Sequence, residues 1–205
     1  MKKIDWYKHY LTKQGLLINP TTLKENWKHD RAFLKILKKF VKPPAKILET
    51  GCGLARTCLS MALTGYKVTA IDIDDRILTL AKLNTKPFTE KIIFKKADFW
   101  KLKIYFKKDS FDCITHGGVL EHFSIKEIQS ILNKQLHIAP YIIFSVPIKS
   151  RWNTKYFDDT IFRNLWLPKF WLVKILKNYN IRYHKVIKDR KDSLVVVLSR
   201  PNNNS

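Results

Sequence analysis

The sequence predicts one α/β domain that contains a mainly parallel sheet with an antiparallel hairpin at its edge. The period of the apolar residues switches repeatedly between 2 and 3.6 along the chain, which is typical of strands alternating with helices. Two strand-like runs near the C-terminus, 181–188 and 193–199, are close enough in sequence to pair as a hairpin. With 205 residues, 45% of them hydrophobic, the chain is long enough to bury one core.

The first half of the chain alternates cleanly. A helical stripe ends at the KPP run at 42–44, and a second helical stretch stops at Gly65, a favourable residue just beyond a helix end. Either Asp74 or Asp75 can cap the helix after the second strand. The elements expected here are a helix, a strand, a helix, a strand and a helix, at 29–41, 46–50, 54–64, 67–72 and from 75 onward.

The second half continues the pattern and then changes. Ser124 and Glu127 form a capping-box sequence ahead of a helical stripe. Beyond residue 147 an aromatic-rich stretch leads into a helix that is expected to end near Asn178. The strands expected are 92–98, 111–116 and 141–146, and the domain expected is 1–200, with a helical cap at 1–41, an insertion at 147–171 and a disordered tail at 201–205.

The charge is strongly basic, with 39 Lys and Arg against 17 Asp and Glu, a net +22. Such a surface attracts nucleic acid, anionic lipid or acidic proteins. The excess is mostly lysine scattered along the whole chain, so nucleic acid is a possible but not a favoured partner. Three cysteines without metal or disulfide spacing, and no signal peptide or apolar run of about 18 residues, predict a cytoplasmic protein without a membrane span.

A glycine turn follows the first strand, in the stretch ILETGCGLART at 47–57. A dinucleotide-binding fingerprint needs a third glycine, and Arg56 stands in its place. Glu49 instead puts a carboxylate just ahead of Gly51 and Gly53. A carboxylate at this point suits a ligand with an ammonium or sulfonium group better than a diphosphate.

Acids also end the next two strands. Asp72 follows Gly53 by nineteen residues and can accept both hydroxyls of a ribose. Asp98 can accept from an exocyclic amine, and Phe99 offers an apolar surface to a purine. Each acid has a simpler alternative, because Asp72 could be a helix cap and Asp98 a turn residue. Their positions at successive strand ends favour a ligand site, since open α/β sheets bind ligands there.

These motifs resemble those of the class I S-adenosylmethionine-dependent methyltransferases. ETGCG (49–53) is similar to their glycine motif, AIDID (70–74) to their ribose-binding acid and KKADFW (95–100) to their adenine-contacting acid. FDCITHGGVLEHF (111–123) resembles the fourth-strand motif of a branch that includes ubiquinone-biosynthesis enzymes. The resemblance implies a Rossmann-like sheet of seven strands in the order 3-2-1-4-5-7-6, with the last strand antiparallel, flanked by helices.

The resemblance also implies the cofactor, S-adenosyl-L-methionine, and the positions that bind it. The implied roles are the methionine end for Glu49, Gly51, Cys52 and Gly53, the ribose for Asp72, the adenine for Ile73, Asp98 and Phe99, and the sulfonium side for His116 and Gly117.

Some motifs of related methyltransferases are missing. No Asn-Pro-Pro-Tyr, Asp-Pro-Pro-Tyr or Pro-Cys sequence follows the fourth strand, which argues against methylation of adenine or cytosine in nucleic acid. Relatives that bind a divalent ion carry Glu-x-x-Glu-His at this point, and here Gly118 replaces the first glutamate. Glu121 and His122 alone seldom hold a catalytic metal, so no metal is predicted.

The expected reaction is methyl transfer by in-line displacement to a small-molecule acceptor. The alternatives are a methyltransferase that acts on RNA or protein, and a non-catalytic binding module. His122 is the leading general base, with the alternative that it only orients its loop, and His116 is expected to form a wall of the cofactor site. Residues 1–28 and 151–166 are expected to close over the acceptor as a lid, or else to pack as a satellite core.

Overall fold

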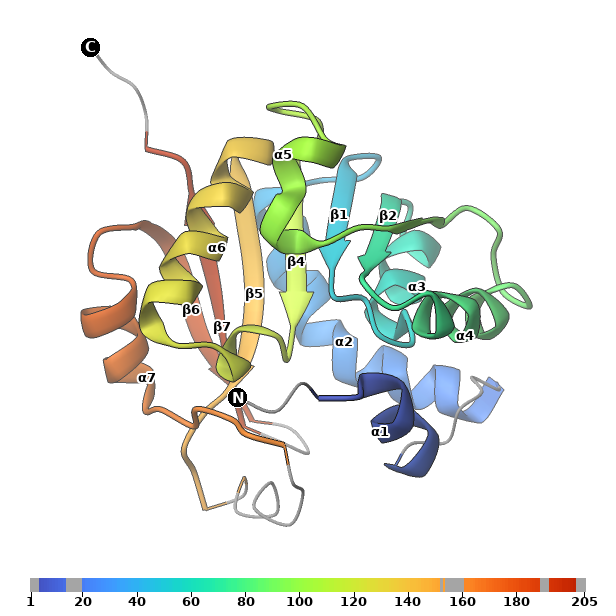
Figure 1. Ribbon diagram of the computed structural model, residues 1–205, viewed down its shortest axis with the longest axis horizontal. Helices are drawn as coiled ribbons and strands as arrows, with labels where there is room; N and C mark the ends of the chain where they lie inside the picture. The colour runs from blue at the N-terminus through green and yellow to red at the C-terminus, as the bar shows by residue number, and fades with distance from the viewer. Residues whose placement is uncertain (1–3, 14–19, 152, 154–160, 189–191, 202–205) are drawn as a thin grey trace. The chain divides into compact units, whose positions relative to one another are not determined.

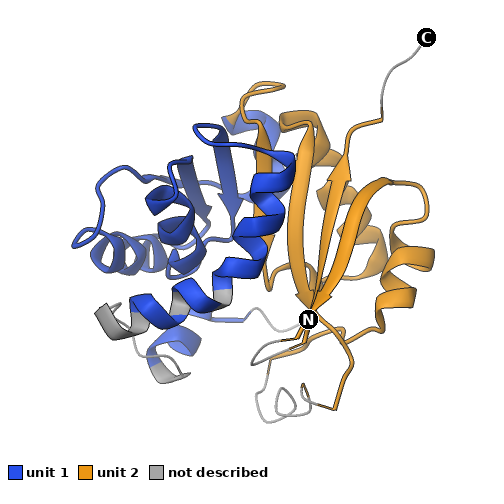
Figure 2. Ribbon diagram, turned by 180° about the vertical axis from the view of Figure 1, so that it is seen from behind, with its two compact units in different colours: residues 1–105 blue, residues 106–205 orange. Residues whose placement is uncertain are grey.

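The computed structural model describes residues 4–13, 20–151, 153, 161–188 and 192–201. The chain divides into two compact units, 1–105 and 106–205 (Figure 2). Seven strands are described: β1 (Lys46–Thr50), β2 (Lys67–Asp72), β3 (Ile93–Lys96), β4 (Cys113–Gly117), β5 (Tyr141–Pro147), β6 (Asn180–Ile187) and β7 (Ser193–Ser199). They form one sheet in the order β3-β2-β1-β4-β5-β7-β6, which confirms the predicted order (Figure 1).

In the first unit, β1, β2 and β3 pair in parallel, with Ile47 opposite Val68 and Ala70 opposite Phe94. The apolar side chains of β1 and β2 are fully buried because helices cover the sheet. The helical segments of this unit are α1 (Trp6–Lys13), α2 (Pro20–Phe40), α3 (Arg56–Leu63), α4 (Asp75–Thr85), the short 3₁₀ segment η1 (Phe99–Lys101) and α5 (Leu102–Tyr105).

Two predicted helix starts were wrong. The helix predicted at 29–41 begins at Pro20, a residue type that suits the first turn of a helix. The prediction missed this first half because its polar side chains give no apolar stripe. The helix predicted from residue 54 begins at Arg56 instead. Ala55 has a left-handed backbone (φ 57°), which a right-handed helix cannot contain.

In the second unit, β4 and β5 pair in parallel, and β7 is antiparallel to both β5 and β6. The predicted edge hairpin is therefore confirmed. The capping box is confirmed as well: the Ser124 hydroxyl accepts from the Glu127 amide, and the Glu127 carboxylate accepts from the Ser124 amide. This box starts α6 (Ile125–Ile138), which follows the short 3₁₀ segment η2 (Leu120–His122).

The helix expected to end near Asn178 is a short turn, α7 (Pro168–Phe170), followed by a π-helical turn over Trp171–Ile175. Trp171 is fully buried, with its ring 6.1 Å from the ring of Phe144, so packing of this large side chain fixes the turn. Among the helices within the described ranges, none combines the length and the apolar character needed to cross a membrane.

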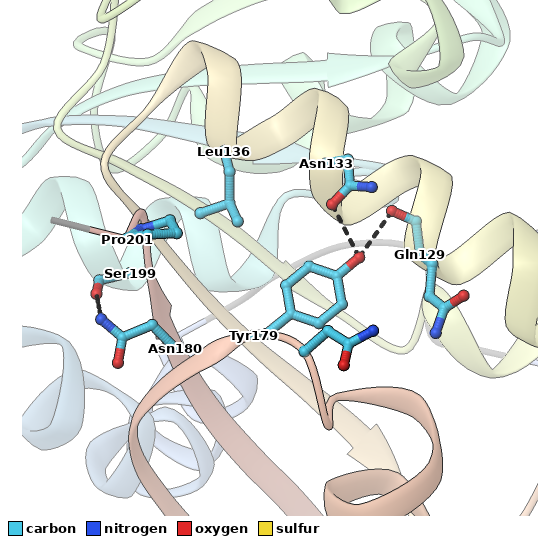
Figure 3. A pocket seen from close by; sticks show the side chains of 8 residues that line it. Gln129, Asn133, Leu136, Tyr179, Asn180, Ser199 and Pro201 are labelled. Atoms are coloured by element: carbon cyan, nitrogen blue, oxygen red, sulfur yellow. Dashed lines mark hydrogen bonds between the residues drawn. The ribbon is translucent and has the colours of Figure 1, made fainter. Parts of the chain in front are cut away.

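A pocket of about 240 Å³ lies between α6 and the start of β6 (Figure 3). Tyr179 reaches across it, and its single hydroxyl proton is shared between two acceptors, the Gln129 carbonyl at 2.9 Å and Asn133 Oδ1 at 3.0 Å. Burial raises the pKa of Tyr179 to about 12, which keeps the hydroxyl a donor. None of the predicted site residues lines this pocket, and Tyr179 ties the segment after the π-turn to α6.

Candidate active site

The predicted glycine turn connects β1 to α3 in the first unit. Gly51 and Gly53 have left-handed backbones, with φ of 66° and 51°. A side chain would be strained at both positions, so the turn favours glycine there. The turn is fixed by the Cys52 amide, which donates to the Ile71 carbonyl at 3.0 Å.

Asp72 ends β2 beside this turn. One carboxylate oxygen accepts from the Gly53 amide at 3.3 Å, and the other accepts from the Asp74 amide at 3.2 Å. Burial raises the pKa of Asp72 above its ordinary value, and the backbone hydrogen bonds oppose that rise. Each oxygen keeps a further lone pair, so the carboxylate can accept two neighbouring hydroxyls of a ligand.

The helix-cap alternative for Asp72 is wrong. Asp74 is the N-cap of α4, and its carboxylate accepts from the Arg76 amide at 2.9 Å. Asp72 therefore holds the glycine turn rather than the helix end.

Glu49 and Cys52 complete the acidic side of the turn. Glu49 is buried at the end of β1, with 5% of its surface exposed. Desolvation, with smaller contributions from the charges of Asp72 and Glu49, raises the pKa of the Cys52 thiol. The thiol therefore stays protonated, and Cys52 lacks the thiolate that a covalent mechanism needs.

The three residues predicted at the adenine lie just beyond the ends of two neighbouring strands, Ile73 after β2 and Asp98 and Phe99 after β3. Ile73 exposes 60% of its surface, so its side chain is available to a flat ligand. Asp98 caps η1, where its carboxylate accepts from the Trp100 amide at 2.8 Å, which supports its turn alternative. Phe99 lies beside Trp100, with ring centroids 5.7 Å apart. Their contacts to an adenine remain predictions.

A residue that no motif indicated lies against the turn. The Tyr10 hydroxyl of α1 would be 2.4 Å from a Cβ atom built on Gly53, so only glycine lets the two segments approach this closely. Arg76 of α4 holds α1 in place: it pairs with Asp5 at 3.2 Å and with Asp74 at 2.6 Å, and its guanidinium lies 4.6 Å from the centre of the Tyr7 ring.

His116 is a buried residue of β4 in the second unit. Its Nε2 lies 3.2 Å from Gln135 Oε1 of α6, and its ring stacks on Phe144 with centroids 5.4 Å apart. The amide oxygen can only accept, so Nε2 carries the proton and donates. Among the described residues, Nδ1 has no hydrogen-bond partner.

Desolvation lowers the pKa of His116 to about 4, although the hydrogen bond that the ring donates to Gln135 opposes this fall, so the ring is neutral. It packs towards α6, and its predicted place beside the sulfonium remains untested. Gly117, which follows it, is exposed, and a Cβ there would lie 3.0 Å from Ser145 Oγ.

His122 lies in η2 and is fixed by the segment that follows β5. Its Nδ1 lies 2.8 Å from the Phe162 carbonyl oxygen, which can only accept, so Nδ1 carries the proton. In this tautomer Nε2 bears the lone pair, and it lies 3.7 Å from Glu121 Oε1. An imidazole that takes up a proton at Nε2 would therefore face a carboxylate, which is a suitable arrangement for a general base.

Hydrogen bonds hold the segment around Phe162 on η2. The Asn164 amide donates to the Glu121 carbonyl at 2.7 Å, and the Asn164 side chain donates to the Phe123 carbonyl at 2.9 Å. Most of the predicted loop lid, residues 152 and 154–160, lies outside the described residues. Within the described ranges, no group of three or more His, Cys, Asp or Glu could hold a metal ion.

The neutral state of His116 predicts a loss of stability in mild acid. Its pKa is about 4 in the folded protein and 6.5 in the unfolded chain, so only the unfolded chain takes up the proton in this window. The contribution of neutral His116 to the free energy of unfolding is complete above pH 6.5 and is lost as the pH falls towards 4. Between pH 8 and pH 5 the free energy of unfolding should fall by about 2 kcal/mol from this residue.

The measurement is urea unfolding of the wild type and of His116→Phe at both pH values. The variant should lack this part of the pH dependence while keeping the part that comes from all other groups. Equal pH dependence in the two proteins would show that His116 is protonated equally in the folded and unfolded states.

Comparisons of the sequence with known proteins identify similar methyltransferases. Residues 47–138 match the family model described as a methyltransferase domain. A protein of Geobacillus sp. (strain WCH70) whose name assigns it as a methyltransferase is 26% identical over 134 residues, which are 62% of this chain and 53% of that protein. The chain thus matches about half the length of this curated relative.

Solved structures share the fold. Magnesium protoporphyrin IX methyltransferase from Synechocystis PCC 6803, with bound S-adenosylhomocysteine, is 17% identical with a TM-score of 0.68, covering 95% of this chain and 92% of that chain. A protein from Pyrococcus horikoshii OT3 is 16% identical with a TM-score of 0.69, covering 96% and 99%.

The matched region contains the glycine turn, Asp72, Asp98 and the fourth-strand motif, which are the features that the sequence shares with one family. The strand order and the antiparallel seventh strand are those expected for it. Residues 47–138 therefore match a methyltransferase domain, and the fold is similar to that of solved S-adenosylmethionine-dependent methyltransferases.

Proposed function

We propose that the protein transfers the methyl group of S-adenosylmethionine to a small-molecule acceptor. The main support for cofactor binding is the Asp72 carboxylate, which is buried at a strand end and held by the Gly53 and Asp74 amides. Asp72 accepts the ribose hydroxyls, Ile73 and Phe99 flank the adenine, and Glu49 attracts the positive end of the cofactor. The bound cofactor supplies an activated methyl group on a sulfonium.

His122 takes the proton that leaves the acceptor. Its Nδ1 proton is fixed on the Phe162 carbonyl, which leaves Nε2 as the basic atom, and Glu121 stabilises the resulting imidazolium. A divalent ion is not part of this proposal. Since the sulfonium already activates the methyl group, the remaining work is alignment of the acceptor and exclusion of water.

Helix α1 forms the lid over the cofactor side. Tyr10 lies on the glycine turn, and Arg76 anchors the helix through Asp5 and Tyr7. This proposal narrows the expected lid from residues 1–28 to the first helix, because residues 20–28 are part of the long helix α2.

A small acceptor is favoured over nucleic acid by the fourth-strand motif, which lacks the base-positioning sequences. One similar structure, the Synechocystis enzyme, is by its name a methyltransferase of magnesium protoporphyrin IX, a small molecule. This likeness supports the acceptor class and not the particular acceptor.

We expect no methyl transfer to bulk RNA, whereas a pool of small metabolites should accept label. The test incubates the purified protein with methyl-labelled S-adenosylmethionine and separate pools of metabolites, RNA and protein. Label in the RNA or protein pool alone would contradict the small-molecule proposal. Label in no pool, despite cofactor binding, would favour a non-catalytic binding module.

A further inference from the structure

The α2 basic stripe consists of five exposed cations on α2: Lys24, Lys28, Arg31, Lys35 and Lys38. They follow one another at intervals of four, three, four and three residues. At about 100° per residue these intervals keep all five side chains within an arc of about 80° on one helix face. These five of the 39 Lys and Arg residues are therefore aligned on one face of this helix.

The stripe lies opposite the buried face of α2. Phe33, Ile36 and Leu37 are buried, and they point about 120° to 180° away from the middle of the stripe. Both acids of the helix, Glu25 and Asp30, fall outside the arc, at about 100° and 120° from Lys24. Figure 2 shows α2 as one long helix on the outside of the 1–105 unit.

No cation of the stripe forms an ion pair with another residue in the part of the chain that the structure describes. From Lys24 to Lys38 the stripe is about 21 Å long, at 1.5 Å for each residue. A row of five uncompensated charges of this length raises the local potential far more than scattered lysines would, and it attracts an extended polyanion.

An exposed aromatic residue lies beside the stripe. Trp27 exposes 37% of its surface and lies about 20° beyond the edge of the arc. A basic track with an aromatic platform is the combination that holds single-stranded nucleic acid, whose phosphates contact the cations while a base stacks on the ring. A membrane helix would need an apolar face for insertion, and the apolar face of α2 is buried.

We propose that the α2 basic stripe and Trp27 bind a single strand of RNA. The interaction depends on phosphate charge and stacking, so it tolerates different sequences. It is separate from methyl transfer to the small acceptor and does not require RNA to be methylated. A strand bound there would hold the enzyme on RNA through a surface that contains none of the proposed cofactor-binding residues.

The test measures binding of a fluorescent single-stranded RNA by anisotropy over a range of salt concentrations. The stripe variant carries Lys28→Gln, Arg31→Gln, Lys35→Gln and Lys38→Gln. Its matched control carries Lys107→Gln, Lys126→Gln, Lys174→Gln and Lys177→Gln, four exposed lysines with the same total charge. Thermal melts and S-adenosylmethionine binding confirm that both variants are folded.

Each phosphate contact contributes about 0.7 to the slope of log K against log salt, so the stripe variant should lose about 3 from that slope. The control variant should lose less than about 1 from the same slope. Trp27→Ala should bind about tenfold more weakly at an unchanged slope, because stacking releases no counterions.

Equal losses in the stripe and control variants would overturn the proposal, since affinity would then follow net charge alone. Tighter binding to polyglutamate or to anionic lipid vesicles than to RNA would also overturn it, as would wild-type affinity in the Trp27→Ala protein.

Discussion

Asp72→Ala should bind S-adenosylmethionine about 1 to 3 kcal/mol more weakly than the wild type, roughly a 5- to 150-fold rise in Kd. The carboxylate sits at the end of β2 and is held in position by the Gly53 and Asp74 amides. Its burial makes each hydrogen bond to a ligand hydroxyl stronger than one in water. Isothermal titration calorimetry of the two proteins measures the difference.

The matched control for this change is Asp75→Ala. Asp75 is a nearby acid in the first turn of α4, where it is exposed and pairs with Lys96. Its loss should leave cofactor affinity within a factor of about two, because exposed ion pairs contribute little. Asp72→Asn keeps one acceptor oxygen and should fall between the wild type and Asp72→Ala.

The Asp72 variants must be tested for folding as well as for cofactor binding. Removal of the carboxylate also leaves two backbone amides of the turn without their partner, so each variant needs a thermal melt. A folded Asp72→Ala protein with wild-type cofactor affinity would remove the ribose assignment. Affinity that falls equally for Asp75→Ala would show a general charge effect instead.

Removal of residues 1–13 should lower the methyl-transfer rate by about tenfold to a hundredfold while the melting temperature changes little. None of residues 4–11 is buried, so α1 contributes little to the core. Its contact with the glycine turn through Tyr10 is where it would exclude water from the cofactor side. Steady-state kinetics and thermal melts of the truncated and full-length proteins measure the two effects.

Two point variants test whether the effect on the rate depends on the anchored position of α1. Arg76→Ala removes the contacts to Asp5 and Tyr7 and should lower the rate in the same direction as the truncation. Lys8→Ala changes an exposed side chain of the same helix and should have no effect on the rate. If the truncated protein loses its cooperative melt, the segment is structural and the lid proposal fails.

The sequence by itself determined the elements and the order of their connections. The strands, the glycine turn, the capping box at Ser124 and the terminal hairpin all follow from signals within a few residues of each other. Such signals act locally, because backbone strain at Gly51 or a missing hydrogen bond at a helix start is felt by neighbouring residues. The start of α2 was predicted wrongly because its exposed first half has no apolar period.

Only the tertiary structure decided which side chains meet over long separations. Asp5 and Arg76 are 71 residues apart, and His122 and Phe162 are 40 apart. Periodicity predicts which face of an element is buried, but it does not identify the side chain or carbonyl that this face contacts. The tautomer of His122, the neutral state of His116 and the place of Tyr10 on Gly53 therefore depend on packing between distant segments.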